Sequence, residues 1–198
     1  MVQSVMEQAA KEDPPVATTT RKPWTADELH RLPPGWRYEI DAGELVIMSP
    51  AGYRHGDLVM RIGRVLGNFV DANRLGRVVG GEAGFRLQST PEILRGADVA
   101  FVSAHRDARI KDRKSFSDIP PDLAVEVHDS SEPDLRRKIE QYLAAGVRSV
   151  WVIDPESRTL TRHVPGEPPR VWNDPDAVVL EPVVPGFSCR LHELFGEA

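Results

Sequence analysis

The hydrophobic positions of this chain predict two amphipathic helices. Between about residues 54 and 71, apolar side chains recur three or four positions apart and form one broad helical face. A second helix is expected to start near Ser131 or Glu132, either of which could cap it, with Pro133 in its first turn and Gly146 at its end. The apolar residues are Leu58, Ile62, Val65, Leu66, Phe69 and Val70 in the first helix, and Leu135, Ile139, Tyr142 and Leu143 in the second.

Short apolar runs around these helices predict strands. Residues 97–102, 123–127 and 149–153 are apolar nearly throughout, which is typical of strands in the middle of a sheet. Two runs flank a turn at Asp41-Ala42-Gly43 and predict an N-terminal β-hairpin. Residues 77–79 and 84–87 are expected to belong to one extended segment with a bulge or bend at Gly80-Gly81, and a further strand is expected at residues 158–164.

The order of these elements predicts the fold class. From residue 54 they run helix, strand, strand, strand, helix, strand, which predicts an α/β protein with a mixed central sheet flanked by helices. The N-terminal β-hairpin precedes this core. Residues 1–22 show no periodicity, so we expect a flexible tail there and a single domain over residues 23–198.

The charge balance limits how the protein could bind nucleic acid. The chain has 25 Lys and Arg residues against 30 Asp and Glu residues, a net charge of -5. Proteins that bind phosphate backbones usually carry more basic than acidic residues. If this chain binds nucleic acid, its positive charge must be concentrated locally, or a bound cation must offset some of its acids. One local candidate is the loop of residues 103–119, which binds a phosphate backbone, acts as a mobile lid or is only solvated. Its expected nucleic-acid-binding residues are Arg109, Lys111, Arg113 and Lys114.

Two further features concern the compartment. No segment reaches the roughly 20 consecutive apolar residues that span a bilayer, and the N-terminus lacks the pattern of a secretory signal. We therefore expect a cytoplasmic protein without membrane contact. Cys189 is the only cysteine, which excludes an internal disulfide, and we expect it to be a small buried side chain.

Asp98, Glu126 and Lys138 are the main candidates for chemistry. The two acids fall on neighbouring expected strands and the lysine on the second helix. Two carboxylates so placed could hold a hard divalent cation, and a nearby lysine could orient a water or offset charge on a phosphate. Glu126 interrupts an apolar strand, where a carboxylate is costly unless it is paired, hydrogen-bonded or bound to metal. The alternatives are a buried salt bridge from Glu126 to an arginine and, for Lys138, a side chain that merely extends to solvent.

The order of the expected elements, together with Asp98, Glu126 and Lys138, resembles the PD-(D/E)XK superfamily, whose members have the restriction-endonuclease-like fold. A set of short motifs extends the comparison to about residues 24 to 195. The motifs are Tyr38-Glu39-Ile40, Gly43-Glu44-Leu45, Ser49-Pro50, Gly80-Gly81-Glu82-Ala83-Gly84-Phe85, Ala97-Asp98-Val99, Asp122-Leu123-Ala124-Val125-Glu126-Val127, Tyr142-Leu143-Ala144-Ala145-Gly146-Val147 and Trp151-Val152-Ile153-Asp154-Pro155. In this order and spacing, they resemble a bacterial family of putative restriction endonucleases.

The resemblance implies hydrolysis that depends on Mg²⁺, with Mn²⁺ as a substitute. Asp98 and Glu126 would be metal ligands and Lys138 the charged helper, supplied from the following helix. In the superfamily's usual pattern the lysine stands two residues after the second acid, where this chain has His128. The chain also has His128-Asp129-Ser130 where the family often has Leu-Ser-Pro.

Four more residues are secondary candidates. Glu82 lies in a glycine-rich break and is either a third acid that binds metal or a solvated loop residue. His128 shares a strand face with Glu126 and could contact metal, water or phosphate. His55, at the start of the first helix, is either part of the site or a satisfied core or capping histidine. Tyr142 follows Lys138 by one turn, so it either hydrogen-bonds in the site or is aromatic core.

Together these observations predict a metal-dependent endonuclease that hydrolyses phosphodiester bonds in DNA. The first alternative is a catalytically inactive protein of the same fold that binds nucleic acid or a protein partner. A second alternative is a hydrolase of another phosphoester. A homodimer is expected, because two cuts on duplex DNA suit twofold symmetry.

Overall fold

The structure is a computed structural model that describes residues 22–29, 31–33, 36–128, 134–173 and 176–196. The predicted N-terminal tail, except Lys22, lies outside this range. No helix in the described segments is long and apolar enough to cross a membrane.

The central sheet is mixed, as the sequence predicts. Its strands follow the order β2-β1-β4-β5-β6-β7-β8, and β3 pairs with β4. All pairs are antiparallel except β5 with β6, which are parallel and joined by α5. The strands are β1 (Arg37–Asp41), β2 (Glu44–Met48), β3 (Gly76–Ser89), β4 (Glu92–Ser103), β5 (Leu123–Val127), β6 (Ser149–Asp154), β7 (Thr159–His163) and β8 (Arg170–Asn173).

Strand β4 divides its hydrogen bonds unequally between its two edges. Along one edge it pairs with β3 over nearly its whole length. Along the other edge it pairs with β1 at Leu94 and with β5 from Val99 to Phe101. The sheet therefore forks at residues 95–98, where β4 has left β1 and has not yet reached β5. Buried backbone groups at such a break need other partners, and side-chain carboxylates supply them, as described below.

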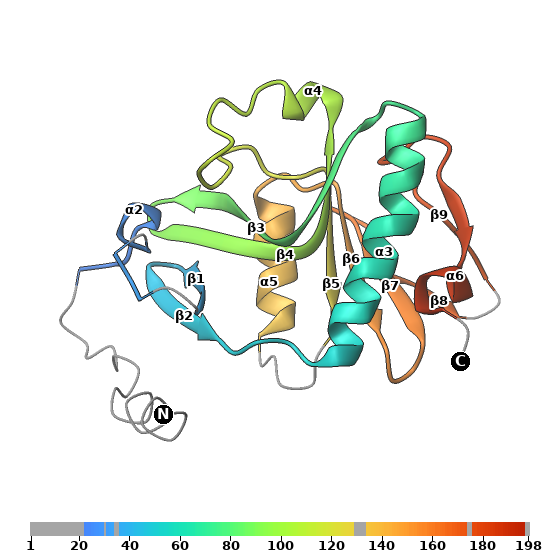
Figure 1. Ribbon diagram of the computed structural model, residues 1–198, viewed down its shortest axis with the longest axis horizontal. Coiled ribbons are helices and arrows are strands. Elements are labelled where there is room, and N and C mark those ends of the chain that lie inside the picture. The colour runs from blue at the N-terminus through green and yellow to red at the C-terminus, as the bar shows by residue number, and fades with distance from the viewer. Residues whose placement is uncertain (1–21, 30, 34–35, 129–133, 174–175, 197–198) are drawn as a thin grey trace, which may run out of the picture.

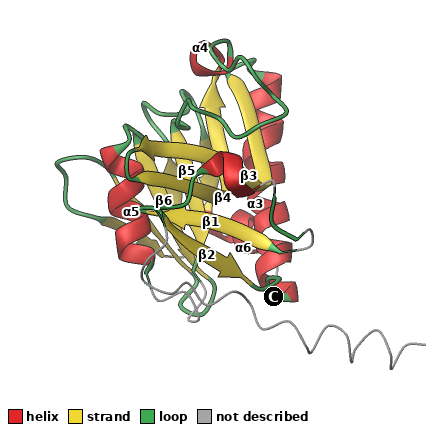
Figure 2. Ribbon diagram, turned by 90° about the vertical axis from the view of Figure 1, so that its left-hand side faces the viewer, coloured by secondary structure: helices red, strands yellow, loops and turns green. Residues whose placement is uncertain are grey.

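Helices cover both faces of the sheet (Figure 1). Figure 2 shows α5 (Leu135–Ala144) on one side of the strands and α3 (Tyr53–Ala72) with α6 (Leu191–Phe195) on the other. The predicted apolar face of α3 is buried in the larger core cluster. Tyr142 of α5 is buried in a second cluster on the opposite face, with Ala100 of β4 and Ala124 of β5. The layered α/β architecture follows from these two apolar interfaces.

Most predicted helices and strands are confirmed. Some begin at a different residue from the one that the local apolar pattern predicts. The N-terminal hairpin, α3, β5, β6 and β7 lie where the apolar pattern predicts them. Residues 76–89 form one strand with a register shift between Gly80 and Ala83, which confirms the predicted irregularity in an extended segment. Strand β4 begins at Glu92, five residues before the predicted start, because it pairs with β3 beyond its apolar stretch. Helix α5 begins after Asp134, and the predicted caps Ser131 and Glu132, with Pro133, lie outside the described residues.

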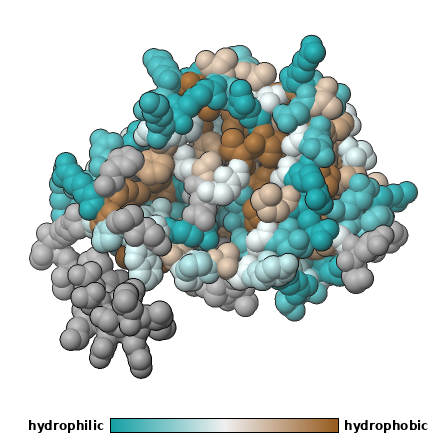
Figure 3. Space-filling view, in the orientation of Figure 1, coloured by the Kyte–Doolittle hydropathy of each residue, from teal (hydrophilic) through white to brown (hydrophobic). Residues whose placement is uncertain are grey.

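The remaining described elements complete the two ends of the chain. Short helices α2 (Ala26–Leu29) and α4 (Ala104–Asp107) precede β1 and follow β4. The small strands β9 (Ala177–Val179) and β10 (Ser188–Arg190) pair with each other near α6, and Cys189 of β10 is a free, buried thiol as predicted. Between α3 and β3 lies a cleft of about 540 Å³ that is lined partly by Val59, Met60, Val78 and Val79. Apolar atoms are visible beside α3 on this face (Figure 3).

Candidate active site

Asp98 lies at the fork of the sheet and joins three elements. One carboxylate oxygen accepts a hydrogen bond from the backbone N–H of Val127 in β5 at 2.8 Å. The other oxygen lies 3.0 Å from Nε2 of His55, in the first turn of α3. The carboxylate therefore supplies a bond that the separated backbones of β4 and β5 do not make. His55 therefore contacts one of the predicted site residues, and its part in the site stays a prediction.

Glu126 lies on the α5 face of β5 and is almost fully buried, at 1% exposure. Its Oε2 accepts a hydrogen bond from Nζ of Lys138 at 2.9 Å, and its Oε1 accepts one from the hydroxyl of Tyr142 at 2.8 Å. Lys138 and Tyr142 are four residues apart on α5, so they project from the same helix face. The predicted convergence of Glu126 and Lys138 is therefore present, and the partner of Glu126 is this lysine rather than an arginine.

Glu39 of β1 is a third buried acid in the same cluster. Its Oε1 lies 3.5 Å from Nζ of Lys138 and accepts a hydrogen bond from the backbone N–H of Gly96 at 2.8 Å. Its Oε2 accepts a hydrogen bond from Arg95 at 2.9 Å. Glu39 is not among the residues that the sequence predicts for the site, although it lies in Tyr38-Glu39-Ile40, one of the motifs that resemble the family. The burial argument that singled out Glu126 applies equally to a glutamate in the hairpin strand Tyr38-Glu39-Ile40.

A polar network supports Glu39 from the side of β1 and α5. The buried guanidinium of Arg95 also lies 3.0 Å from Asp41, and its Nε donates to Gln141 at 2.8 Å. Gln141 in turn donates to Asp41 at 2.7 Å, and Arg137 lies 3.0 Å from the same carboxylate. Buried charges are stable only when they are paired in this way. The network fixes the position of β1 relative to α5.

The electrostatics of the cluster are dominated by burial and by acids close to one another. Burial raises the pKa of Glu126 to about 8, against the lowering effect of Lys138, and the charges of Asp98 and Glu39 raise it further. Burial and the charge of Glu126 also raise the pKa of Tyr142 well above its ordinary value. Since like charges repel, a cation would be stabilised beside these carboxylates.

The chemistry of the donors suits a cation that keeps part of its hydration shell. Among the residues that the structure describes, no group of three or more His, Cys, Asp or Glu side chains is arranged to hold a metal ion. Mg²⁺, however, is commonly bound by one or two carboxylates together with waters and substrate phosphates. Asp98 and Glu126 provide two carboxylates whose charges interact across the fork. This donor set fits Mg²⁺ that binds together with a phosphate substrate.

The remaining secondary candidates are His128, which follows β5, and Glu82 in β3. The backbone N–H of His128 donates to Ile153 at 2.7 Å. Burial tends to raise the pKa of Asp154, but hydrogen bonds from Ser157 and Glu156 and the charge of His128 together lower it. No direct contact between His128 and Glu126 is found in the described structure. Glu82 lies in β3 within the register shift, and its side chain is outside the described part of the protein.

The predicted basic residues of the 103–119 loop are not brought to the acids. This loop connects the end of β4 with the start of β5, whereas Glu126 lies near the end of β5. Figure 1 shows α4 and the following loop at the opposite end of the molecule from the first turn of α3. Arg113 is engaged by Asp107 at 2.9 Å, and this hydrogen bond is the main cause of the lowered pKa of Asp107. A role of Arg109, Lys111, Arg113 and Lys114 in binding nucleic acid stays a prediction.

The fold and the clustered acids and lysine define a protein of the restriction-endonuclease-like class. A family model described as putative restriction endonuclease, Uma2, matches residues 26–192. The chain therefore belongs to this family. A crystal structure of a putative nuclease belonging to DUF820 from Anabaena variabilis is similar in fold, with a TM-score of 0.73 and 19% sequence identity over 87% of this chain and 98% of that one. A comparison with curated proteins found no match.

Proposed function

We propose that this protein is a metal-dependent endonuclease that hydrolyses phosphodiester bonds in DNA. The observation that carries the proposal is the cluster of Asp98, Glu126 and Lys138 at the fork between β4 and β5. Family membership supports a nuclease-like function. The assignment of DNA as the substrate is part of the proposal.

In this proposal Asp98 and Glu126 hold the divalent cation. When bound, Mg²⁺ lowers the pKa of a coordinated water and polarises the scissile phosphate. Asp98 is held in position by the N–H of Val127, and Glu126 by Lys138 and Tyr142. The ammonium of Lys138 hydrogen-bonds the attacking water or a phosphate oxygen and offsets negative charge that develops on the phosphate. Glu39 and the hydroxyl of Tyr142 keep Lys138 and Glu126 aligned.

His55 has a positioning role in this scheme. Its Nε2 lies 3.0 Å from Asp98, and residues that hydrogen-bond metal-binding side chains commonly fix their orientation. His128 lies at the end of β5 where the superfamily usually has its lysine, and we propose that it contacts the bound phosphate. Glu82 remains a proposed third acid.

The proposal is tested with plasmid DNA, Mg²⁺ or Mn²⁺, and purified variants. Glu126→Gln keeps the shape and both hydrogen-bond partners of the side chain but removes its charge, so cleavage should fall by about 100-fold or more, since even groups behind the metal ligands often cost 10- to 100-fold. Arg136→Met is a matched control on α5, because Arg136 is exposed and its ion-pair partner among the described residues is Glu140. Equal cleavage by wild type and Glu126→Gln would contradict a catalytic role for this acid.

One observation favours the alternative of an inactive binding protein. Both carboxylate oxygens of Glu126 already accept hydrogen bonds, one from Lys138 and one from Tyr142. In an inactive protein this arrangement would serve stability alone, and Mg²⁺ would bind without any dependence on Asp98. Titration calorimetry of wild type and Asp98→Asn with Mg²⁺ separates the two, since the endonuclease proposal expects the variant to lose the heat of binding.

A homodimer is proposed because duplex DNA presents two strands related by approximate twofold symmetry. Light scattering coupled to size-exclusion chromatography tests this directly, with and without a short duplex. A mass of one chain under both conditions would exclude a stable dimer at the concentration used.

A further inference from the structure

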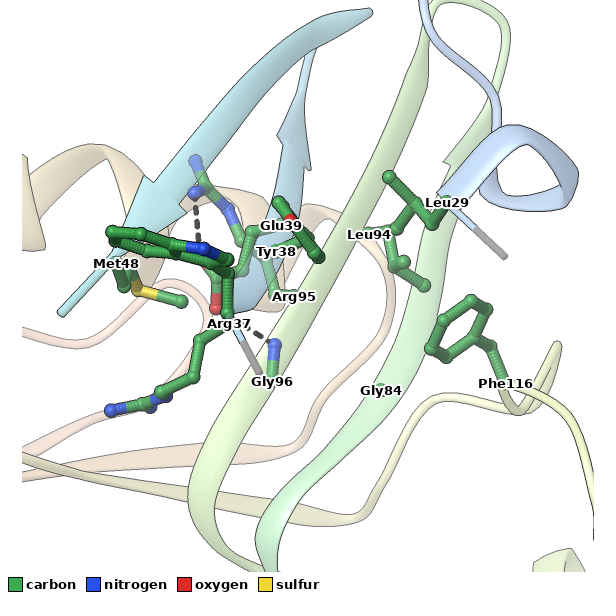
Figure 4. A pocket seen from close by; sticks show the side chains of 11 residues that line it. Leu29, Arg37, Tyr38, Glu39, Met48, Gly84, Leu94, Arg95, Gly96 and Phe116 are labelled. Carbon is green, nitrogen blue, oxygen red and sulfur yellow. Dashed lines mark hydrogen bonds and ion pairs between the residues drawn. The ribbon is translucent and has the colours of Figure 1, made fainter. Parts of the chain in front are cut away.

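A small pocket with aromatic walls adjoins Glu39. Its volume is about 230 Å³. It lies between the β1–β2 hairpin, which contributes Tyr38 and Met48, and the strands β3 and β4 (Figure 4). Trp36 precedes β1, Leu94 lies in β4, and Phe116 comes from the segment before β5. Residues far apart in the sequence thus surround one concave site, as is usual for binding pockets.

Two of the aromatic residues have fixed positions, and the third is exposed. The hydroxyl of Tyr38 donates to the carbonyl of Pro33 at 2.9 Å, which restricts its ring. Phe116 packs so closely on Gly84 that a Cβ atom there would lie 2.5 Å from the ring. Trp36 is 55% exposed, whereas the other three tryptophans, Trp24, Trp151 and Trp172, are at most 8% exposed. Trp36 therefore offers an indole surface to solvent beside two fixed aromatic walls.

The pocket adjoins the cluster of acids through shared residues. Glu39, Arg95 and Gly96 line it, and Oε1 of Glu39 lies 3.5 Å from Nζ of Lys138, which in turn bonds Glu126. Glu39 is therefore a member of both the pocket lining and the cluster. A phosphodiester bound beside Lys138 would have the nucleoside attached to it within reach of the pocket.

We propose that this pocket binds an unstacked nucleobase of the nucleic acid that is cut at the acids. The inference rests on the proposed function and extends it to a substrate contact. Aromatic side chains stack on any base, because each base has a π-face, and enzymes commonly take a base out of its stack into such a pocket. Trp36 is the principal stacking surface, with Tyr38 and Phe116 as the other walls. The pocket therefore favours a locally single-stranded or opened substrate.

The test measures binding rather than cleavage, in the full-length Glu126→Gln background with Mg²⁺ so that the strand stays intact. A short single-stranded DNA labelled with fluorescein should bind about tenfold more weakly when Trp36 is replaced by alanine, since stacking of one base contributes about this factor. Trp36→Phe should bind within about threefold of the parent, because phenylalanine keeps a stacking face. Val171→Ala removes a different exposed apolar side chain and should have no effect.

Two further measurements locate the base. Because only Trp36 among the four tryptophans is substantially exposed, strand binding should quench tryptophan fluorescence in the parent and lose that quenching in Trp36→Phe. An abasic site scanned along the strand should weaken binding at one position in the parent and at none in Trp36→Ala. A free nucleoside monophosphate should quench weakly, which distinguishes capture of a base within a strand from a dedicated nucleotide site.

The outcomes separate the pocket from the proposed activity. If strands bind but Trp36→Ala and the abasic scan have no effect, the pocket inference is wrong while the endonuclease proposal is untouched. If neither strands nor millimolar nucleoside monophosphate quench Trp36, the inference is also wrong. If Trp36 is quenched in a base-dependent manner but wild type never cleaves, the pocket inference stands and the endonuclease proposal fails.

Discussion

The ammonium of Lys138 lies 2.9 Å from Oε2 of Glu126, and both side chains are buried between α5 and β5. Moving two charges out of water costs desolvation free energy. A buried ion pair offsets this only when its geometry is close and further polar groups bond to it. Tyr142 donates a hydrogen bond to Glu126 at 2.8 Å, and Oε1 of Glu39 lies 3.5 Å from the ammonium of Lys138. The contribution of each residue to stability should therefore depend on the presence of the other.

Glu126 and Lys138 should be energetically coupled. Lys138→Met leaves a carboxylate buried without its cation and should lower the free energy of unfolding by about 3 kcal/mol at pH 8. The same substitution should cost much less in a Glu126→Gln background. A double-mutant cycle measured by urea denaturation should give a coupling of at least about 1 kcal/mol. The exposed pair Arg136–Glu140 on the same helix provides the control, with an expected coupling below about 0.5 kcal/mol.

Stability without divalent cations should decline as the pH rises through the range in which Glu126 ionises. The pKa of Glu126 is raised from 4.5 to about 8 in the folded protein, so the folded state holds a proton that the unfolded state releases earlier. This contribution is fully present below pH 4.5 and is lost as the pH rises to about 8, with a slope of up to about 1.4 kcal/mol per pH unit. Thermal denaturation in EDTA, compared with Glu126→Gln, isolates it. Parallel pH profiles of the two proteins would contradict the prediction.

Arg95 should be important for stability because it compensates two acids at once. Its guanidinium contacts Glu39 at 2.9 Å and Asp41 at 3.0 Å, and all three side chains are largely buried. Arg95→Met should therefore lower the free energy of unfolding by about 3–5 kcal/mol. Arg54→Met, which removes a guanidinium from an exposed pair with Glu156, should change it by less than about 1 kcal/mol. Chemical denaturation of both variants tests this, and similar losses in the two would be inconsistent with a special role for Arg95.

The start of β3 should require glycine at position 76. Gly76 has a φ of +151°, and a Cβ atom there would lie 2.1 Å from the backbone carbonyl oxygen of Val102. Gly76→Ala should therefore destabilise the protein by about 3 kcal/mol, because both strands of the β3–β4 pair would have to move. Gly56→Ala is the control, since a Cβ meets nothing within 4 Å there and alanine should stabilise α3 by up to about 1 kcal/mol. Melting temperatures of the two variants should move in opposite directions.

The local sequence pattern predicted the elements well where apolar residues recur with a helical period or form a continuous run. The apolar positions of α3 identified its buried face, and the apolar runs identified β5 and β6, because these elements owe their burial to their own residues. The same patterns missed the early start of β4. Its first residues contain polar side chains and are ordered by pairing with β3 and β1, which a local window does not include.

The sequence by itself determined that two acids on adjacent strands and a lysine on the next helix belong together. A carboxylate inside an apolar strand needs a partner, and the periodicity of α5 turned Lys138 towards the sheet. Only the tertiary structure decided that Glu39 joins them, that His55 contacts Asp98, and that the basic loop lies at the opposite end of β5. These relationships depend on how β4 shares its edge between β1 and β5. Contacts such as that between Arg95 and Glu39, 56 residues apart, arise from long-range strand pairing that no local periodicity encodes.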